Sequence, residues 1–272
     1  MVLHLDPEQA VDITLPLHPQ GPQVQMYDVP PAIAVPYQSG QWTGDVKQGG
    51  SCNFDTWTLT PHCHGTHTET LGHLTEPRPP IAWVLRQPLC TAVLITVQPI
   101  QATKTAETYT PALEPTDWVL TRTAIELALA KEFASSESPF PQALVIRLPK
   151  AESELKGFGE GRFKDYTQRP AAFFTTEAMA YLASLPLTHL IVELPSLDRA
   201  RDEGLLSNHR LWWGLPPGDT DPTHARHPFR TITELVWVPN ELTDSRYIAD
   251  IQPLAWMAEA APSRVWLYPH ST

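Results

Sequence analysis

Cysteine is scarce in this sequence. Only Cys52, Cys63 and Cys90 occur among 272 residues. An odd and sparse set does not form a disulfide framework, so we expect free thiols and a cytoplasmic protein. Long hydrophobic runs are lacking as well. No apolar run approaches the roughly 20 residues of a membrane span, and the N-terminus lacks the basic start and apolar core of a signal peptide.

Basic residues are also few. The chain has 19 Lys and Arg against 30 Asp and Glu, which gives a formal net charge of −11 and a pI near 5.4. Nucleic acids and anionic membranes both require a basic footprint, so we expect neither as a partner. The length is sufficient for one large hydrophobic core or two small ones.

Proline, by contrast, is abundant. The chain contains 29 prolines, about twice the usual share. Each proline removes a backbone donor and disfavours helix at the residue before it. This content excludes a helical bundle and favours a loop-rich fold built on strands.

The hydrophobic pattern predicts several strands and few helices. Strands are expected at residues 54–60, 92–97, 143–148, 189–194, 231–238 and 264–269. Helices are expected where Thr123 and Glu126 form a capping box before residues 125–133, and where Thr176 caps residues 177–185. A helix between the strands at 143–148 and 189–194 is a βαβ pattern, which is typical of parallel strands buried on both faces. We therefore predict one α/β domain over residues 1–272, with a mixed sheet.

Four of the eleven histidines lie within twelve residues. The stretch from Pro61 to Leu74 reads PHCHGTHTETLGHL, so a cysteine and a glutamate accompany the histidines. Imidazole, thiolate and carboxylate are the ligand types that zinc takes, and other mid-series transition metals accept a similar set. The alternative is a histidine-rich surface loop without a role, which the mixture of three ligand types disfavours.

The spacing of this stretch is as informative as its content. The residues that share one parity are Cys63, Gly65, His67, Glu69 and His73. In an extended chain their side chains project from the same face, and Gly65 leaves a gap where a metal or substrate could approach. His62 and His64 would then face the opposite way. The pattern predicts a metal site on one face of this segment.

Two later segments carry further candidates. A polar turn with Ser196 and Asp198 follows the strand at 189–194, and His209 comes next, beside two tryptophans. Glu234 lies among apolar neighbours, where a carboxylate is costly unless it is paired or bound to a metal. A packed histidine and a water-facing edge glutamate are the alternatives. We expect His209 and Glu234 to lie within reach of the metal site.

These segments resemble the cyclase family of metal-dependent hydrolases, which includes the bacterial kynurenine formamidases and isatin hydrolase. The family signature H-x-G-T-H-x-D-x-P-x-H corresponds here to C-H-G-T-H-T-E-T-L-G-H, from Cys63 to His73. Cys63, Glu69 and Leu71 replace its first histidine, its aspartate and its proline. The blocks VELPSLDRARDEGLLSNHRLWW, ITELVWVP and APSRVWLYP are similar to later parts of the family, so the resemblance spans residues 10–270.

The resemblance implies a compact β/α/β swivelling domain, assembled as a homodimer or homotetramer. It also implies one or two ions, most often zinc and sometimes manganese. The residues at metal-ligand positions are Cys63, His67, Glu69, His209 and Glu234. His73 corresponds to the catalytic histidine. His62 or His64 could replace Cys63 as ligand through a local kink, and His224 and His227 have no counterpart in the family.

The resemblance favours an enzyme, and the departures from the signature favour zinc. A thiolate at residue 63, together with Glu69, suits zinc better than manganese. The leading hypothesis is a hydrolase that cleaves a small aryl formamide or a cyclic amide through a metal-activated water, with His73 moving the proton. The alternative is a non-catalytic metal-binding relative with a closed site. A third hypothesis makes Cys63 a nucleophile with a histidine base.

Overall fold

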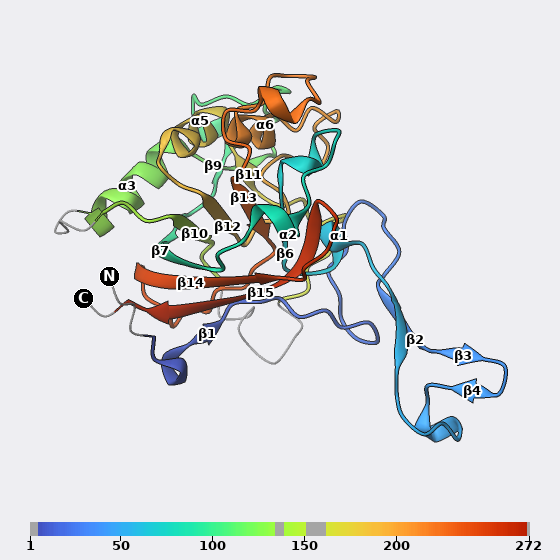
Figure 1. Cartoon of the computed structure of the whole chain (residues 1–272). Helices are drawn as coiled ribbons and strands as arrows, with labels where there is room; N and C mark the ends of the chain where they lie inside the picture. Colours follow the sequence, from blue (N-terminus) through green and yellow to red (C-terminus); the bar gives the residue numbers. More distant parts are fainter. Residues whose placement is uncertain (1–4, 134–138, 151–161, 271–272) are drawn as a thin grey trace.

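The computed structural model describes residues 5–133, 139–150 and 162–270, and its centre is a mixed sheet that closes on itself (Figure 1). In order across the sheet, the strands are β1 (Val11–Asp12), β15 (Ala260–Pro269), β14 (Ser245–Pro253), β7 (Leu89–Thr96), β10 (Ala143–Arg147), β12 (His189–Val192), β13 (Thr231–Glu234) and β6 (His67–Glu69). β6 pairs with both β13 and β15, which closes the sheet into a barrel.

The parallel strands lie in the middle of this sheet. β7, β10, β12 and β13 pair in parallel, whereas β14, β15 and β6 pair antiparallel with their neighbours. All residues of β10 and β12 are buried. The predicted parallel strands with both faces covered are therefore confirmed, as is the α/β class with a mixed sheet.

Three helices cover one face of the sheet (Figure 1). They are α3 (Arg122–Phe133), α5 (Thr176–Ser184) and α6 (Ser207–Trp213). Their buried residues join one core with alternate residues of β7, β10 and β12, and the other residues of these strands form a second core with β14 and β15. None of the helices in the described ranges has the length and apolar character that a bilayer crossing requires.

The helix starts differ from the predicted caps by one or two residues. Thr121, and not Thr123, accepts a hydrogen bond from the backbone of Ala124 at 3.3 Å. Thr175, and not Thr176, caps α5 by accepting from the backbone of Ala178 at 3.1 Å. Thr121 and Thr123 lie two residues apart, and Thr175 and Thr176 are adjacent. The sequence pattern does not distinguish which threonine of each pair caps the helix.

The strand predicted at 231–238 is shorter than expected. β13 ends at Glu234, because Leu235 adopts a left-handed backbone with φ of +56°. A branched residue in this region carries strain of about 1 kcal/mol or more. The chain then leaves β13 and runs beside the N-terminal segment, where Trp237 donates its backbone N–H to Ile13 at 2.7 Å.

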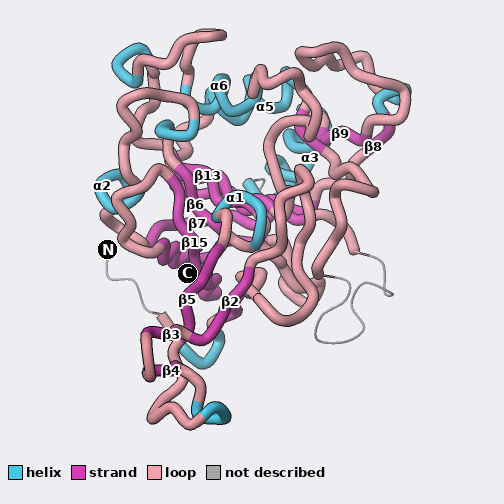
Figure 2. The backbone as a smooth tube through the Cα atoms, turned by 90° about the vertical axis from the view of Figure 1, so that its right-hand side faces the viewer, coloured by secondary structure: helices cyan, strands magenta, loops and turns pink. Residues whose placement is uncertain are grey.

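An arm formed by residues 33–58 projects from the body in both Figure 1 and Figure 2. It contains β2 (Ile33–Pro36), β3 (Gln38–Ser39), β4 (Trp42–Thr43) and β5 (Asp55–Thr58). The predicted strand at 54–60 is β5, and all four of its residues are exposed. A small separate sheet contains β8 (Ile100–Gln101), β9 (Trp118–Leu120) and β11 (Phe173–Phe174). The other described regular elements are two short helices, α1 (Pro61–His64) and α2 (Ile81–Val84), and five 3-10 turns.

Candidate metal centre

β6 carries the centre of the site. It lies between β13 and β15, and its residues His67, Thr68 and Glu69 are all buried. The hydroxyls of Thr68 and Thr233 bond at 2.9 Å on the opposite face of the strands, which fixes the register. In this register His67 is paired with Glu234, and their Nε2 and Oε2 atoms lie 3.4 Å apart.

The first group of potential ligands is His67, Glu69 and Glu234. Each offers one atom within 4.8 Å of the others, and all three side chains are buried. The Nδ1 atom of His67 lies 3.1 Å from the carbonyl of Gly65. Donation of Nδ1–H to that oxygen leaves the Nε2 lone pair directed at the two carboxylates, the arrangement typical of a ligating imidazole.

Several buried atoms of this group lack hydrogen bonds. In the part of the chain that the structure describes, Nε2 of His67 and both carboxylate oxygens of Glu69 make no hydrogen bond of good geometry, although imidazole nitrogens of His62 and His209 lie 3.1 and 3.3 Å from Glu69. Buried polar atoms without partners cost free energy, and two buried carboxylates side by side add repulsion. A divalent cation would satisfy these atoms and offset the negative charge, so the residues present fit a metal.

His209 completes this group from a distant segment. Its Nε2 lies 3.3 Å from Glu69 and 3.6 Å from Glu234. Its Nδ1 lies 2.6 Å from Asp198, which also accepts the His209 backbone N–H at 3.1 Å. The expected proximity of His209 and Glu234 to His67 and Glu69 is therefore confirmed, while their ligation of a metal remains a prediction.

The charges of the site compensate one another without a metal. Burial acts to lower the pKa of His209, but Asp198, Glu234 and Glu69 raise that pKa well above its usual value. Burial acts to raise the pKa of Glu69, but the surrounding histidines hold it well below its usual value. The raised pKa of His209 favours its protonated form beside these carboxylates, and a bound cation would replace that proton.

A second group of potential ligands shares Glu69. It contains His62, His73 and Glu259 in addition. The His62 Nδ1 lies 3.1 Å from Glu69, and its Nε2 lies 2.9 Å from Glu259. The Nδ1 atom of His73 lies 3.7 Å from Glu69 and 4.0 Å from Glu259. Glu69 thus lies between two sets of nitrogen and oxygen donors.

The segment before β6 is not extended, which corrects the parity argument. Residues Pro61–His64 form the short helix α1, so His62 points toward Glu69 instead of away from it. Cys63 is buried outside both groups, and burial together with the nearby Glu234 raises the pKa of its thiol to about 11. Its assignment as a ligand remains a prediction.

The expectation at Gly65 is wrong, whereas His64 lies outside both ligand groups found among the described residues. The gap at Gly65 is filled by protein, because an added Cβ would lie 3.1 Å from the Leu15 carbonyl and 3.0 Å from the Leu17 side chain. His64 is held by the backbone, since its Nδ1 accepts from Thr60 at 2.8 Å and its Nε2 lies 3.0 Å from the Pro30 carbonyl. These contacts make His64 a packing residue that anchors the N-terminal segment.

The structure adds three residues that the sequence argument did not assign to the site. Asp198 orients His209, and the polar turn after the strand at 189–194 was its only signal. Glu259 packs closely against the backbone at Gly72, which has no side chain. A Cβ added at Gly72 would lie only 2.6 Å from the Glu259 Cβ. Tyr27 adopts a left-handed backbone with φ of +54°. Glu259 and Tyr27 had no signal in the sequence.

Tyr27 connects the site to a cavity of about 760 Å³. Burial and the nearby Glu234 raise the pKa of its phenol to about 12, and its hydroxyl bonds with Ser196. Both residues line the cavity, together with Asp198 and Trp118. The size is within the range of small-molecule sites. This cavity is therefore the candidate path for a substrate.

The tryptophans that follow His209 pack against it in the core. Trp212 and Trp213 are fully buried in the helix-covered core, and the Trp213 ring lies 6.0 Å from the His209 ring. His224 is exposed and its Nδ1 lies 2.7 Å from Asp219. His227 lies in the same loop, and neither histidine belongs to the two ligand groups found among the described residues.

Several solved structures have a similar fold at low sequence identity. Isatin hydrolase A from Labrenzia aggregata, bound to benzyl benzoate, has a TM-score of 0.61 at 15% identity, over 96% of this chain and 94% of that one. An isatin hydrolase bound to the product analogue thioisatinate has a TM-score of 0.59 at 16% identity, over 97% and 93%. A predicted metal-dependent hydrolase from Bacillus stearothermophilus has a TM-score of 0.56 at 15% identity, over 95% and 97%.

A sequence comparison with curated proteins finds no match. The family model described as "Putative cyclase" matches residues 11–199, which is more than half of the chain. The matched region includes β6 and the Asp198 turn. It also includes His62, His67, Glu69 and His73 of the two ligand groups, whereas Glu234 and Glu259 lie after it. The chain therefore belongs to the cyclase family.

Proposed function

We propose that this protein is a metal-dependent hydrolase that cleaves the C–N bond of a small aryl formamide or a cyclic amide. The observation that carries the proposal is the buried group of His67, Glu69 and Glu234, which offers one nitrogen and two carboxylate oxygens within 4.8 Å of one another. His209 would complete the coordination of one ion. Zinc suits this mixture of imidazole and carboxylate, with manganese as the second candidate.

The remaining residues have roles that follow from their positions. A divalent ion held by this group would polarise the substrate carbonyl and make the attacking water more acidic. His73 lies beside Glu69 without being fully buried, so it can take a proton from water and deliver it to the leaving nitrogen. Glu259, 4.0 Å from the His73 Nδ1, can stabilise the imidazolium that forms.

The second group allows a second ion that shares Glu69. His62 and Glu259 would hold it together with Glu69, which belongs to both groups. Support for the hydrolase class comes from membership of the cyclase family and from the similarity of the fold to that of isatin hydrolases. The formamide alternative comes from the resemblance to kynurenine formamidases.

A metal-reconstitution experiment tests this proposal. Chelator-stripped protein is titrated with zinc or manganese, and hydrolysis of formanilide and of isatin is followed. We expect activity to rise with metal and to saturate at one or two equivalents. His67→Ala should bind metal weakly and remain inactive, whereas His224→Ala, which removes an exposed histidine outside the site, should behave as wild type. Activity that is independent of metal would refute the proposal.

A non-catalytic metal-binding relative is the second candidate. It is favoured by one observation, which is that neither of the two described cavities is lined by Glu69 or His67. Tight zinc binding without hydrolysis of either amide class would select this candidate.

We also propose that the protein assembles as a homodimer or homotetramer through the arm. Ile33, Val35, Trp42, Phe54 and Trp57 are each between 45% and 75% exposed there. A two-stranded hairpin is marginally stable alone in water, and a concentration of exposed apolar side chains marks an interaction surface. A second copy of the chain would cover this surface.

A further inference from the structure

Tyr27 lies at the centre of a strained turn. Tyr27 and Asp28 both adopt a left-handed backbone with φ of +54°. Val29 donates its backbone N–H to the Met26 carbonyl at 3.1 Å, which closes a type I′ turn. The two central positions of such a turn favour Asn-Gly, because other side chains make a positive φ costly. Strain of this kind clusters at functional sites, where the surrounding structure maintains it.

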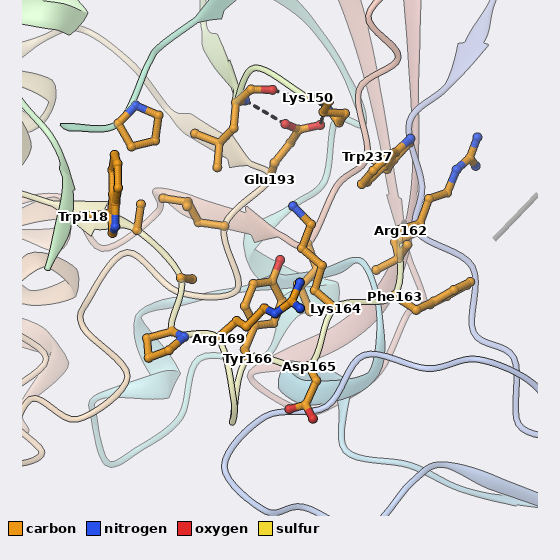
Figure 3. Close-up of a pocket in the computed structure, with 18 of the residues that line it drawn as sticks. Trp118, Lys150, Arg162, Phe163, Lys164, Asp165, Tyr166, Arg169, Glu193 and Trp237 are labelled. Carbon is orange, nitrogen blue, oxygen red and sulfur yellow. Dashed lines mark hydrogen bonds and ion pairs between the residues drawn. The ribbon is translucent and has the colours of Figure 1, made fainter. Parts of the chain in front are cut away.

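The loop around this turn is held by its neighbours. The Gln23 side chain bonds with both backbone groups of Ala32, each at 2.8 Å, and so closes the base of the loop. Gln25 pairs with residues 164–166 through backbone hydrogen bonds of 3.1 and 2.8 Å. Arg169, farther along that segment, lines both the cavity beside Tyr27 and a second cavity of about 630 Å³, which Figure 3 shows. The strained turn is therefore fixed against the wall between two cavities.

The Tyr27 hydroxyl reaches the edge of the metal centre. It bonds with Ser196. Burial and the nearby Glu234 raise the pKa of the phenol, and His209 lowers it, so both residues lie within electrostatic reach. Ser196 Oγ accepts the backbone N–H of Asp198 at 3.2 Å, which leaves its own hydrogen available for the Tyr27 oxygen. The phenol hydrogen is then available for a group in the cavity.

The cavity that Tyr27 lines suits an aryl amide. Its volume of about 760 Å³ is within the range of small-molecule sites, and Trp118 and Phe173 contribute aromatic walls. Tyr27 is 49% exposed, so its phenol is accessible from this space. Asp198, which bonds with the His209 Nδ1, lines the same cavity. An aryl amide packed against these rings can therefore present its carbonyl to the Tyr27 hydroxyl.

We infer that Tyr27 is a catalytic residue whose phenol O–H donates a hydrogen bond to the amide carbonyl oxygen of the substrate. This role rests on the proposed function. Attack of water on the amide carbon forms a C–O bond and moves the carbonyl π electrons onto oxygen. His73 takes the proton of the water and delivers it to nitrogen as the C–N bond breaks. Tyr27 keeps its proton throughout and stabilises the negative oxygen, which lowers the energy of the transition state more than that of the bound substrate.

Tyr27→Phe tests this role, because it removes the hydroxyl and keeps the ring. With formanilide and isatin as substrates of the zinc-loaded protein, kcat should fall by about 100-fold, while KM changes by less than about threefold. Zinc affinity should remain that of wild type. Tyr181→Phe is the matched control, since Tyr181 lies on α5 with its ring 5.4 Å from the Arg122 guanidinium. It should behave as wild type. Unchanged kcat in Tyr27→Phe would overturn the inference and leave the proposed function standing.

A binding experiment tests the same contact without turnover. Calorimetry on zinc-loaded protein compares oxindole, a cyclic aryl amide that is stable in water, with indoline, which has a methylene group in place of the carbonyl. Tyr27→Phe should weaken oxindole binding by about five- to tenfold, because one hydrogen bond is lost, and leave indoline binding unchanged. This result would support the Tyr27 contact even if wild type hydrolysed neither substrate. Equal weakening of both ligands, unaffected oxindole binding, or no binding of oxindole by wild type would overturn the inference.

Discussion

Asp198→Asn tests how the site holds His209. Asp198 is buried and its two oxygens accept hydrogen bonds from several groups. One oxygen receives the His209 backbone N–H at 3.1 Å and its Nδ1 at 2.6 Å. The other receives the Tyr109 hydroxyl at 2.8 Å and the Asn208 backbone N–H at 2.9 Å. Asparagine keeps the shape but turns one acceptor into a donor that faces N–H groups.

The expected cost has two parts. Loss of the charge-assisted bonds and of the negative charge opposite His209 should reduce the free energy of unfolding by about 3 kcal/mol. Misorientation of the imidazole should weaken zinc binding by about 10- to 100-fold, the usual effect of removing a partner of a ligating histidine. Urea unfolding measures the first part, and competition with a chromophoric chelator measures the second.

Asp202→Asn is the matched control. Asp202 is buried in the same loop and accepts the backbone N–H groups of Gly204 at 3.0 Å and Leu206 at 2.6 Å, as a purely structural carboxylate. This variant should lose stability without losing zinc affinity. If folded Asp198→Asn binds zinc as tightly as wild type, His209 is not a ligand and the reasoning is wrong.

Three further predictions concern catalysis, pH and assembly. His73→Ala should keep the metal but lose about 10²- to 10⁴-fold in hydrolysis, and unchanged turnover would remove His73 from the mechanism. Burial lowers the pKa of His189 to about 4, below the usual 6.5, so its contribution to stability is present above pH 6.5 and is lost as the pH falls toward 4. The loss amounts to about 3 kcal/mol, and urea unfolding of His189→Asn should show a correspondingly flatter pH dependence, whereas an identical slope would contradict the burial argument. Replacing residues 37–54 of the arm by a two-residue Asn-Gly turn should reduce the mass in light scattering to that of one chain, whereas a monomeric full-length protein would contradict the assembly proposal.

The sequence predicted the sheet better than the site. Runs such as residues 144–146 and 190–192 are apolar and branched, which is typical of buried strands, and β10 and β12 pair in parallel as expected. The exact starts of the helices depended on which of two neighbouring threonines made the capping hydrogen bond. Thr121 and Thr175 cap the helices, while the backbone N–H groups of Thr123 and Thr176 bond with Glu107 at 3.3 Å and with the Thr108 carbonyl at 2.8 Å.

The site required information that no local pattern contains. The parity argument holds from His67 to Glu69, where the chain is a strand, and fails at Pro61–His64, where a proline starts a helical turn. Glu259 lies 190 residues after Glu69 and reaches it only because β15 pairs with β6. Glu234 could be predicted as a site residue from the sequence, because a carboxylate within a buried apolar run needs a partner.

Anomalous diffraction from zinc-soaked crystals tests the central claim most directly. The account predicts a zinc peak at coordination distance, about 2.0–2.2 Å, from the His67 Nε2 atom and from carboxylate oxygens of Glu69 and Glu234, with His209 beside it. A zinc peak elsewhere on the protein, or no peak at saturating zinc, would contradict a metal centre assembled from these three distant segments.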